Sequence, residues 1–236
     1  MALPLFRMGP SLELIGTELL YTIIVIAISA LIYRKTQEVY RLTKHSGVFH
    51  FRNVFLYFAI AYSFRLVLMF VKLSRELLSM SLPQEIHGIS IMLVGYFSTL
   101  AILSLIMTLV ARRLKRWESS TPYILHGIAI GLSLLAFFTF SPAVVLFVQT
   151  VFLFTFLLLF LLFRDSKGHR GFLSHNRITY LLLFVFWLVN MLAFTRRLLP
   201  QYVKIPLYLL SAVVYMSIYH RVHQRLSSHG KKKRSS

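Results

Sequence analysis

YILHGIAIGLSLLAFFTFSPAVVLFVQTVFLFTFLLLFLLF, residues 123–163, is an almost wholly apolar stretch of 41 residues. A helix that crosses a lipid bilayer needs about 20 apolar residues, so this stretch is too long for one span and long enough for two. Ser141 and Pro142 lie near its middle, and the residue before a proline is biased away from the helical conformation. We therefore predict two spans, 122–140 and 142–163, joined by a tight turn. The alternative is a re-entrant pair, which would lower the number of spans in the chain to five or six.

The same length rule identifies five further apolar segments along the chain. They are residues 14–33, 53–72, 86–111, 178–196 and 204–221. Hydrophobic residues make up 57% of the sequence and the mean hydropathy is +0.71, a composition that one soluble core of this size cannot bury. The sequence therefore predicts an all-α integral membrane protein, with one bundle of seven transmembrane helices over residues 1–222 and a disordered polybasic tail at 223–236. The longest connection is expected at 34–52, with one or two amphipathic helical turns.

The charge of the chain is strongly unbalanced, with 26 Lys and Arg against seven Asp and Glu. In a soluble protein this would indicate nucleic acid binding, but here the basic residues form short clusters between apolar segments. We therefore expect anionic lipid headgroups as partners and no nucleic acid. Of the 26 basic residues, 19 fall on one side of the predicted bundle and six on the other. The positive-inside rule then places the N-terminus outside and the C-terminus in the cytoplasm, and we expect a multi-pass protein of the cell membrane.

The tail carries the densest basic cluster, formed by Lys231, Lys232, Lys233 and Arg234. Such a cluster next to a last span is usually a solvated anchor on the cytoplasmic side. It can also bind anionic lipid headgroups or an acidic partner. Both interpretations stay open at the level of sequence.

One charge interrupts an apolar segment: Arg65, in YFAIAYSFRLVLMF at 57–70. An arginine at the centre of a span costs about 2.5 to 3.5 kcal/mol on insertion scales, so it usually faces the bundle and finds a partner there. At about 1.5 Å per residue, Arg65 lies about 10 Å below the outer end of its span and Glu18 about 7 Å below the outer end of the first. We therefore predict that Glu18 and Arg65 form an ion pair.

Further polar residues of other spans are expected at a similar depth. They are Tyr62, Tyr96, Gln149, Asn190, Tyr208 and Ser211. One interpretation is a buried pair that fixes helix register, supported by hydrogen bonds between helices. The other is a polar pocket open to the outside that binds a small anionic or zwitterionic ligand, with Arg65 as anchor and Glu18 as its counter-ion when the pocket is empty. A facing partner subunit is the third interpretation.

Gly127 and Gly131 form a G-x-x-x-G spacing in the fourth predicted span, which lets another helix approach closely. Packing inside the bundle is favoured over dimerisation because a bundle of seven helices has many internal contacts to make.

The sequence offers little to catalysis or cofactor binding. Cysteine is absent, and the nine histidines form no metal-binding motif such as H-x-x-x-H. There is no G-x-S-x-G, no P-loop and no pair of intramembrane acids. Lys204 is expected at the outer mouth of the last span and not inside it, so a retinal Schiff base is not expected. We therefore predict no enzyme, no metal site and no cofactor.

The layout, with seven spans, an outer N-terminus and a basic cytoplasmic face, resembles seven-helix receptors in topology. It implies a small receptor-like or sensory protein whose outer pocket includes Arg65, and whose signal passes to a separate membrane or cytoplasmic protein. Signalling would require two helix arrangements that contact the ligand differently. The alternatives are a small-solute transporter or channel that uses the same pocket, and a structural subunit of a larger membrane complex.

Overall fold

The computed structural model describes residues 12–78, 84–110, 120–139, 142–162, 177–194 and 200–232. Within these ranges the chain is all-helical, in agreement with the predicted fold class. The seven described helices are α1 (Leu12–Thr43), α2 (Ser46–Leu78), α3 (Gln84–Val110), α4 (Thr121–Thr139), α5 (Pro142–Leu162), α7 (Arg177–Phe194) and α8 (Gln201–Lys232). Six of them are long and apolar enough to cross a membrane, and the seventh, α7, has a shorter apolar part over Ile178–Ala193. This is the architecture of a membrane-embedded protein.

The long apolar stretch is divided as predicted, with α4 ending at Thr139 and α5 beginning at Pro142. Proline is favoured in the first turn of a helix, where its missing N–H has no acceptor to lose. The two segments are separate helices of 19 and 21 residues.

Helix ends differ from the prediction between α1 and α2. The predicted loop at 34–52 is wrong, because α1 continues to Thr43 and α2 begins at Ser46. Lys44 directly follows α1, and its φ of 48° is a left-handed conformation that ends the helix. At the start of α2, the Gly47 N–H donates to His45 Nδ1 at 3.0 Å. The added helical turns, 34–43 and 46–52, are amphipathic and lie outside the apolar segments, so hydropathy alone does not assign them to the two spanning helices.

Helix α8 also extends beyond its apolar segment, as far as Lys232. It therefore includes residues 223–232 of the predicted tail, and pairs four residues apart support it: Gln224 Nε2 lies 2.7 Å from His220 Nε2, and the rings of Tyr219 and His223 stack. Of the predicted headgroup cluster, Lys231 and Lys232 end this helix, with side chains that are not described. Lys233 and Arg234 lie outside the described residues.

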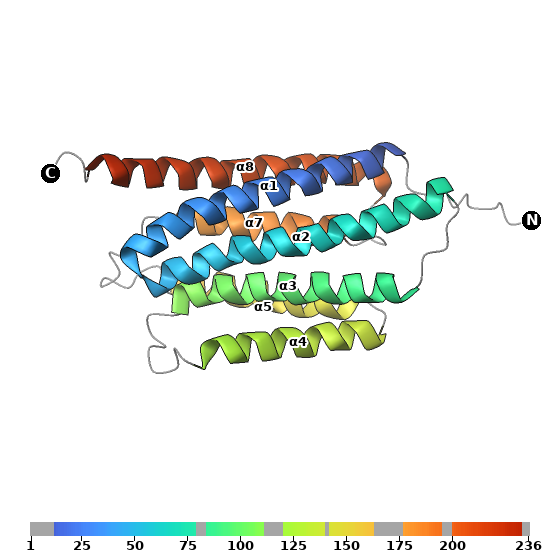
Figure 1. The fold of residues 1–236 in the computed structure, drawn as a ribbon, viewed down its shortest axis with the longest axis horizontal. Helices are drawn as coiled ribbons and strands as arrows, with labels where there is room; N and C mark the ends of the chain where they lie inside the picture. Colours follow the sequence, from blue (N-terminus) through green and yellow to red (C-terminus); the bar gives the residue numbers. More distant parts are fainter. Residues whose placement is uncertain are drawn as a thin grey trace, which may run out of the picture.

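The helices lie side by side along the bundle, with α4 at one edge (Figure 1). Six of the described helices form a ring in which each packs on the next, in the order α1, α2, α3, α5, α7, α8 and back to α1, whereas α4 lies outside this ring and packs mainly against α3 and α5. Helices α1 to α4 alternate in direction, and α8 runs parallel to α1. Below, the end of the bundle where α1 begins is called the Glu18 end and the opposite end is called the Arg52 end.

Aromatic side chains of α2 and α7 meet across the ring and divide its interior. The Phe58 ring lies 5.5 Å from Phe186 and 5.2 Å from Trp187, centroid to centroid, and Phe186 stacks on Tyr215 of α8 at 4.3 Å. One compartment lies among α1, α2, α7 and α8, and the other among α2, α3, α5 and α7. The candidate site extends across both.

Candidate functional site

The predicted ion pair is present at the Glu18 end. Arg65 Nη2 of α2 lies 2.9 Å from Glu18 Oε1 of α1, with 10% and 20% of the two side chains exposed. The same nitrogen donates to the Tyr208 hydroxyl of α8 at 3.3 Å. The approximate depths along two neighbouring helices were therefore sufficient to identify the partner.

Three tyrosine rings surround the Arg65 guanidinium. Its carbon lies 5.4 Å from the ring centroid of Tyr62, 5.7 Å from that of Tyr208 and 5.9 Å from that of Tyr21. A cation within about 6 Å of an aromatic face is attracted by the ring quadrupole, and more strongly when it is desolvated. Arg65 is therefore stabilised by one carboxylate and by three aromatic rings.

A hydrogen-bonded cluster next to this cage joins four helices. The hydroxyls of Tyr21 and Tyr62 donate to Asn190 Oδ1 at 2.5 and 2.7 Å, and Asn190 Nδ2 donates to Ser211 Oγ at 2.8 Å. Ser211 Oγ lies 3.0 Å from the Tyr21 hydroxyl, which closes the cycle. Since these residues belong to α1, α2, α7 and α8, the cluster fixes the register of one compartment. We call it the Asn190 cluster.

The other compartment contains a cavity of about 100 Å³. Its wall is mostly apolar, and its polar lining residues are Tyr62, Arg65, Ser98, Gln149, Trp187 and Asn190. Tyr62 and Asn190 belong to both the cavity wall and the Asn190 cluster. Arg65 likewise lies between the cavity and its carboxylate partner, so the two compartments share three polar side chains.

Gln149 joins the site as a lining residue on the α5 wall. Its Nε2 donates to Ser98 Oγ at 2.6 Å and to Thr99 Oγ1 at 3.3 Å, both on α3. These two bonds join α5 to α3 and orient the Gln149 amide. The position of Gln149 along its predicted span indicated its depth in the bilayer, and it does line the cavity. That position could not identify its hydrogen-bond partners.

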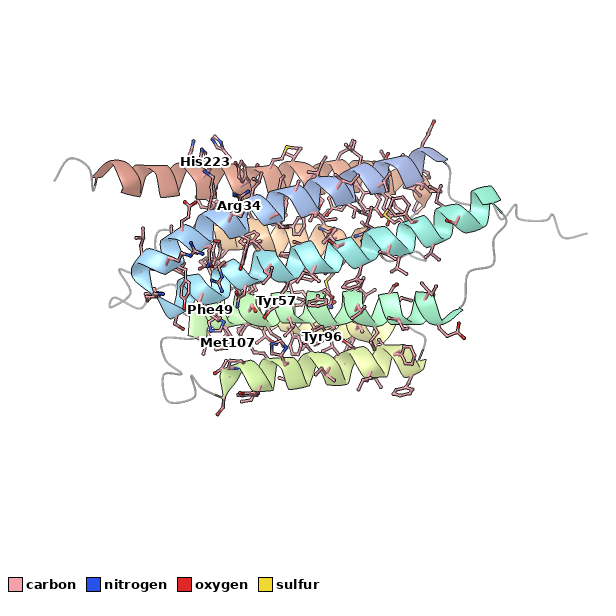
Figure 2. All side chains as sticks on the ribbon, in the orientation of Figure 1. Arg34, Phe49, Tyr57, Tyr96, Met107 and His223 are labelled. Carbon is pink, nitrogen blue, oxygen red and sulfur yellow. The ribbon has the colours of Figure 1, made fainter. Side chains whose placement is uncertain are left out.

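Tyr96 does not join the predicted site. Its hydroxyl lies 2.6 Å from His126 Nδ1 of α4, and its side chain lies between α3 and α4 (Figure 2). Tyr96 is halfway along Gln84–Val110, so it is less close to the Glu18 end than predicted, and it faces away from the ring interior. Depth gives no information about the direction in which a side chain leaves its helix.

Gly127 and Gly131 lie on the outer face of α4. A Cβ atom added at either glycine would meet no described atom within 4 Å, whereas Ala129, Ser133 and Ala136 are buried against the bundle. The predicted internal packing through the two glycines is therefore wrong. The small residues that let α4 approach its neighbours are on the opposite face.

Sequence reasoning did not include three residues of the site. Tyr21 shares a helical face with Glu18, three residues earlier, and that spacing was the available signal. Trp187 and Ser98 line the cavity, but an indole or a hydroxyl within an apolar segment gives no comparable signal.

A second buried cation, Arg52, lies at the other end of the bundle. It is 9% exposed, and its guanidinium carbon lies 4.8 Å from the Phe49 centroid, 4.9 Å from that of Tyr40 and 5.4 Å from that of Tyr33. It also donates to the side chains of Gln37 and Asn53. Arg52 lies one residue before the predicted span 53–72 and was therefore predicted to be a loop charge, whereas α2 begins at Ser46 and includes it.

Helices α1 and α8 meet again at the Arg52 end. Lys35 Nζ lies 2.8 Å from His223 Nδ1, and His223 projects from α8 beside α1 (Figure 2). The two helices are therefore joined near both ends, through Tyr21 and Ser211 at one and through Lys35 and His223 at the other.

The chain has a relative of almost the same length. Over 222 residues it is 33% identical to an uncharacterized protein of Archaeoglobus fulgidus, and the aligned region covers 92% of this chain and 96% of that protein. No protein-family model and no solved structure matches the chain. At this identity and coverage, the chain belongs to the same family as the Archaeoglobus fulgidus protein.

Proposed function

We propose that this protein is a receptor-like, sensory membrane protein that binds a small ligand in the cavity between α2, α3, α5 and α7. The observation that carries the proposal is the position of Arg65, which lines the cavity and is held by Glu18 from α1 at 2.9 Å. A mostly apolar pocket with a few convergent polar groups is the usual form of a small-molecule site.

The Asn190 cluster supports a signalling role. Tyr62 and Asn190 line the cavity and also hold α1 and α8 through Tyr21 and Ser211. A ligand that contacts these two residues differently in two helix arrangements would shift the balance between them. The movement would reach the Arg52 end through α1 and α8, where a membrane or cytoplasmic protein would detect it.

The interior beyond the cavity favours this role over solute transport. Toward the Arg52 end the same compartment is filled by the rings of Phe51, Phe156 and Tyr180, which are at most 1% exposed and pack against one another. A channel or transporter would need these rings to separate in each cycle.

The proposal includes seven transmembrane spans, with the Glu18 end outside the cell and the C-terminus in the cytoplasm. Four described basic residues in the last turns of α1 and directly after it, Arg34, Lys35, Arg41 and Lys44, belong to the Arg52 end. They would face anionic lipid headgroups on the cytoplasmic side of the cell membrane. Helix α7 is shorter than the other spans and would cross the bilayer as a member of the ring, between α5 and α8.

The experiment combines a thermal-shift solute screen on the purified full-length protein with the variant Glu18→Gln. A ligand raises the apparent stability of the state that binds it. Glu18→Gln leaves Arg65 without its carboxylate, so we expect a loss on the order of 2 kcal/mol without ligand. Because an anionic ligand then supplies the missing charge, the ligand-induced shift should be larger in this variant than in the wild type.

The double variant Glu18→Gln/Arg65→Gln tests the anchor. Removing both charges together avoids an isolated buried ion, so we expect a melting temperature near that of the wild type and no ligand-induced shift. Tyr96→Phe, outside the cavity, is the control and should retain the shift. If Glu18→Gln is destabilised and no solute restores it, the pair only fixes helix register.

A further inference from the structure

From the wall of the cavity we infer that its ligand is a small amphiphilic monoanion, a carboxylate on an aliphatic or aromatic body, and not a zwitterion or an amine. This inference rests on the proposed function, because it names the ligand class of the same cavity. The sequence predicts an anionic or a zwitterionic ligand, and this inference keeps the anionic one.

The charge of the wall excludes an ammonium group. Among the lining residues Arg65 is the one ionised side chain, and none is Asp or Glu. Glu18 does not line the cavity and binds Arg65 from α1. An ammonium group in the cavity would therefore be desolvated next to a cation and without a carboxylate, which is among the most costly arrangements in a protein interior.

The hydrogen-bonding groups of the wall favour an acceptor. The indole N–H of Trp187, a residue that is 6% exposed, has no hydrogen-bond partner among the described residues. Asn190 Oδ1, by contrast, already accepts from two tyrosines. A buried donor without an acceptor costs more than a hydrogen bond contributes. A carboxylate supplies both an acceptor for the Trp187 indole N–H and a negative charge for Arg65.

The rest of the wall suits an apolar body of limited size. Ile91, Val94, Val145 and Leu146 of α3 and α5 line the side of the cavity away from α1. Because one water molecule needs roughly 10–15 Å³ of such space, a cavity of about 100 Å³ holds roughly seven to ten groups of that size. Hexanoate and benzoate have this size and carry a single negative charge.

The experiment compares five probes by thermal shift and calorimetry on the purified full-length protein. The probes are hexanoate, benzoate, hexanol, hexylamine and 6-aminohexanoate, which keep a similar body and vary the charge. We expect saturable binding of hexanoate and benzoate, at least tenfold weaker binding of hexanol, and no detectable binding of hexylamine or 6-aminohexanoate.

Two variants connect the binding to the cavity. Val94→Phe places a ring in the cavity and should abolish hexanoate binding, whereas Val151→Phe makes the same change on the exposed face of α5, where Val151 is 48% exposed, and should leave binding unchanged. Trp187→Phe removes the indole N–H and should weaken hexanoate about fivefold to tenfold, with a smaller effect on hexanol.

The outcomes separate this inference from the proposed function. If hexylamine or 6-aminohexanoate binds as well as hexanoate and Val94→Phe abolishes that binding, the cavity is a ligand site but the monoanion class is wrong. If all probes bind alike in the wild type and in Val94→Phe, they partition into detergent and the inference fails. If no solute of any charge binds, both proposals fail.

Discussion

Two arginines at opposite ends of this bundle show two ways of keeping a guanidinium out of water. Arg65 has a carboxylate at 2.9 Å and three tyrosine rings. Arg52 has three aromatic rings and two amide side chains. Arginine suits both sites because its planar, delocalised cation is weakly hydrated and stacks on rings.

Arg52→Lys should therefore destabilise the protein although it conserves the charge. An ammonium group cannot stack on Phe49 and Tyr40 while it binds the amides of Gln37 and Asn53, so we expect a loss of about 2 kcal/mol. Arg41→Lys, at an exposed position of α1, is the matched control and should change stability by less than about 0.5 kcal/mol. Chemical unfolding in detergent measures both; equal effects would show that the aromatic contacts to Arg52 add nothing.

The Asn190 cluster makes a second prediction at this scale. Asn190→Leu removes the acceptor that the hydroxyls of Tyr21 and Tyr62 share and leaves them the longer contacts to Ser211 Oγ at 3.0 Å and to each other at 3.1 Å, so we expect a loss of about 1–3 kcal/mol. The triple variant Tyr21→Phe/Tyr62→Phe/Asn190→Leu removes donors and acceptor together and should recover most of the loss. A triple variant less stable than Asn190→Leu would mean that these longer contacts satisfy the hydroxyls.

The distance of each polar residue from the end of its predicted span identified much of the site. It did not predict the direction in which a side chain leaves its helix. Glu18, Tyr62, Arg65, Asn190, Tyr208 and Ser211 were predicted from their distance along each span and do meet. Tyr96 lies farther from the Glu18 end than predicted, and its side chain faces α4. The rotation of a helix about its axis depends on its neighbours, and an apolar segment without a polar face does not reveal them.

At the scale of elements, the apolar runs predicted every described helix, including the break between α4 and α5. The ends were less predictable, because α1, α2 and α8 continue as amphipathic turns beyond the length that a bilayer needs. The packing face of α4 was not predictable either. Small residues occur on both of its sides, and those that are buried against the bundle include Ala129, Ser133 and Ala136.

The two faces of α4 should therefore respond oppositely to a larger side chain. Ala129 is fully buried, so Ala129→Leu forces α4 away from α3 and α5 and should cost about 1–3 kcal/mol. Gly127→Leu should be tolerated, because its Cβ meets no described atom within 4 Å. Thermal unfolding in detergent measures both. A large loss from Gly127→Leu alone would indicate that another molecule covers that face.

At the scale of the whole molecule, composition and the distribution of charge predicted a membrane-embedded helical bundle. They could not predict the ring or the position of α4 outside it, because hydropathy carries no information about which helices are neighbours. The Archaeoglobus fulgidus relative matches nearly the full length of the chain, so the whole bundle is the unit shared by the family.

The proposed orientation can be tested directly because the chain has no cysteine. Arg41→Cys places one thiol at the Arg52 end and Glu85→Cys places one at the Glu18 end, and both native side chains are exposed. In intact cells, a membrane-impermeant maleimide should label Glu85→Cys and spare Arg41→Cys until the cells are lysed. The reverse pattern would place the basic face outside the cell.

Asn190 Oδ1 accepts both tyrosine hydroxyls, so the hydrogen bonds from α1 and from α2 to α7 end on one oxygen atom. A ligand that rotated this amide would break both hydrogen bonds at once, while the Glu18–Arg65 ion pair and the Tyr21–Ser211 contact would remain. Helices α1 and α2 would then lose their bonds to α7 together and not one after the other.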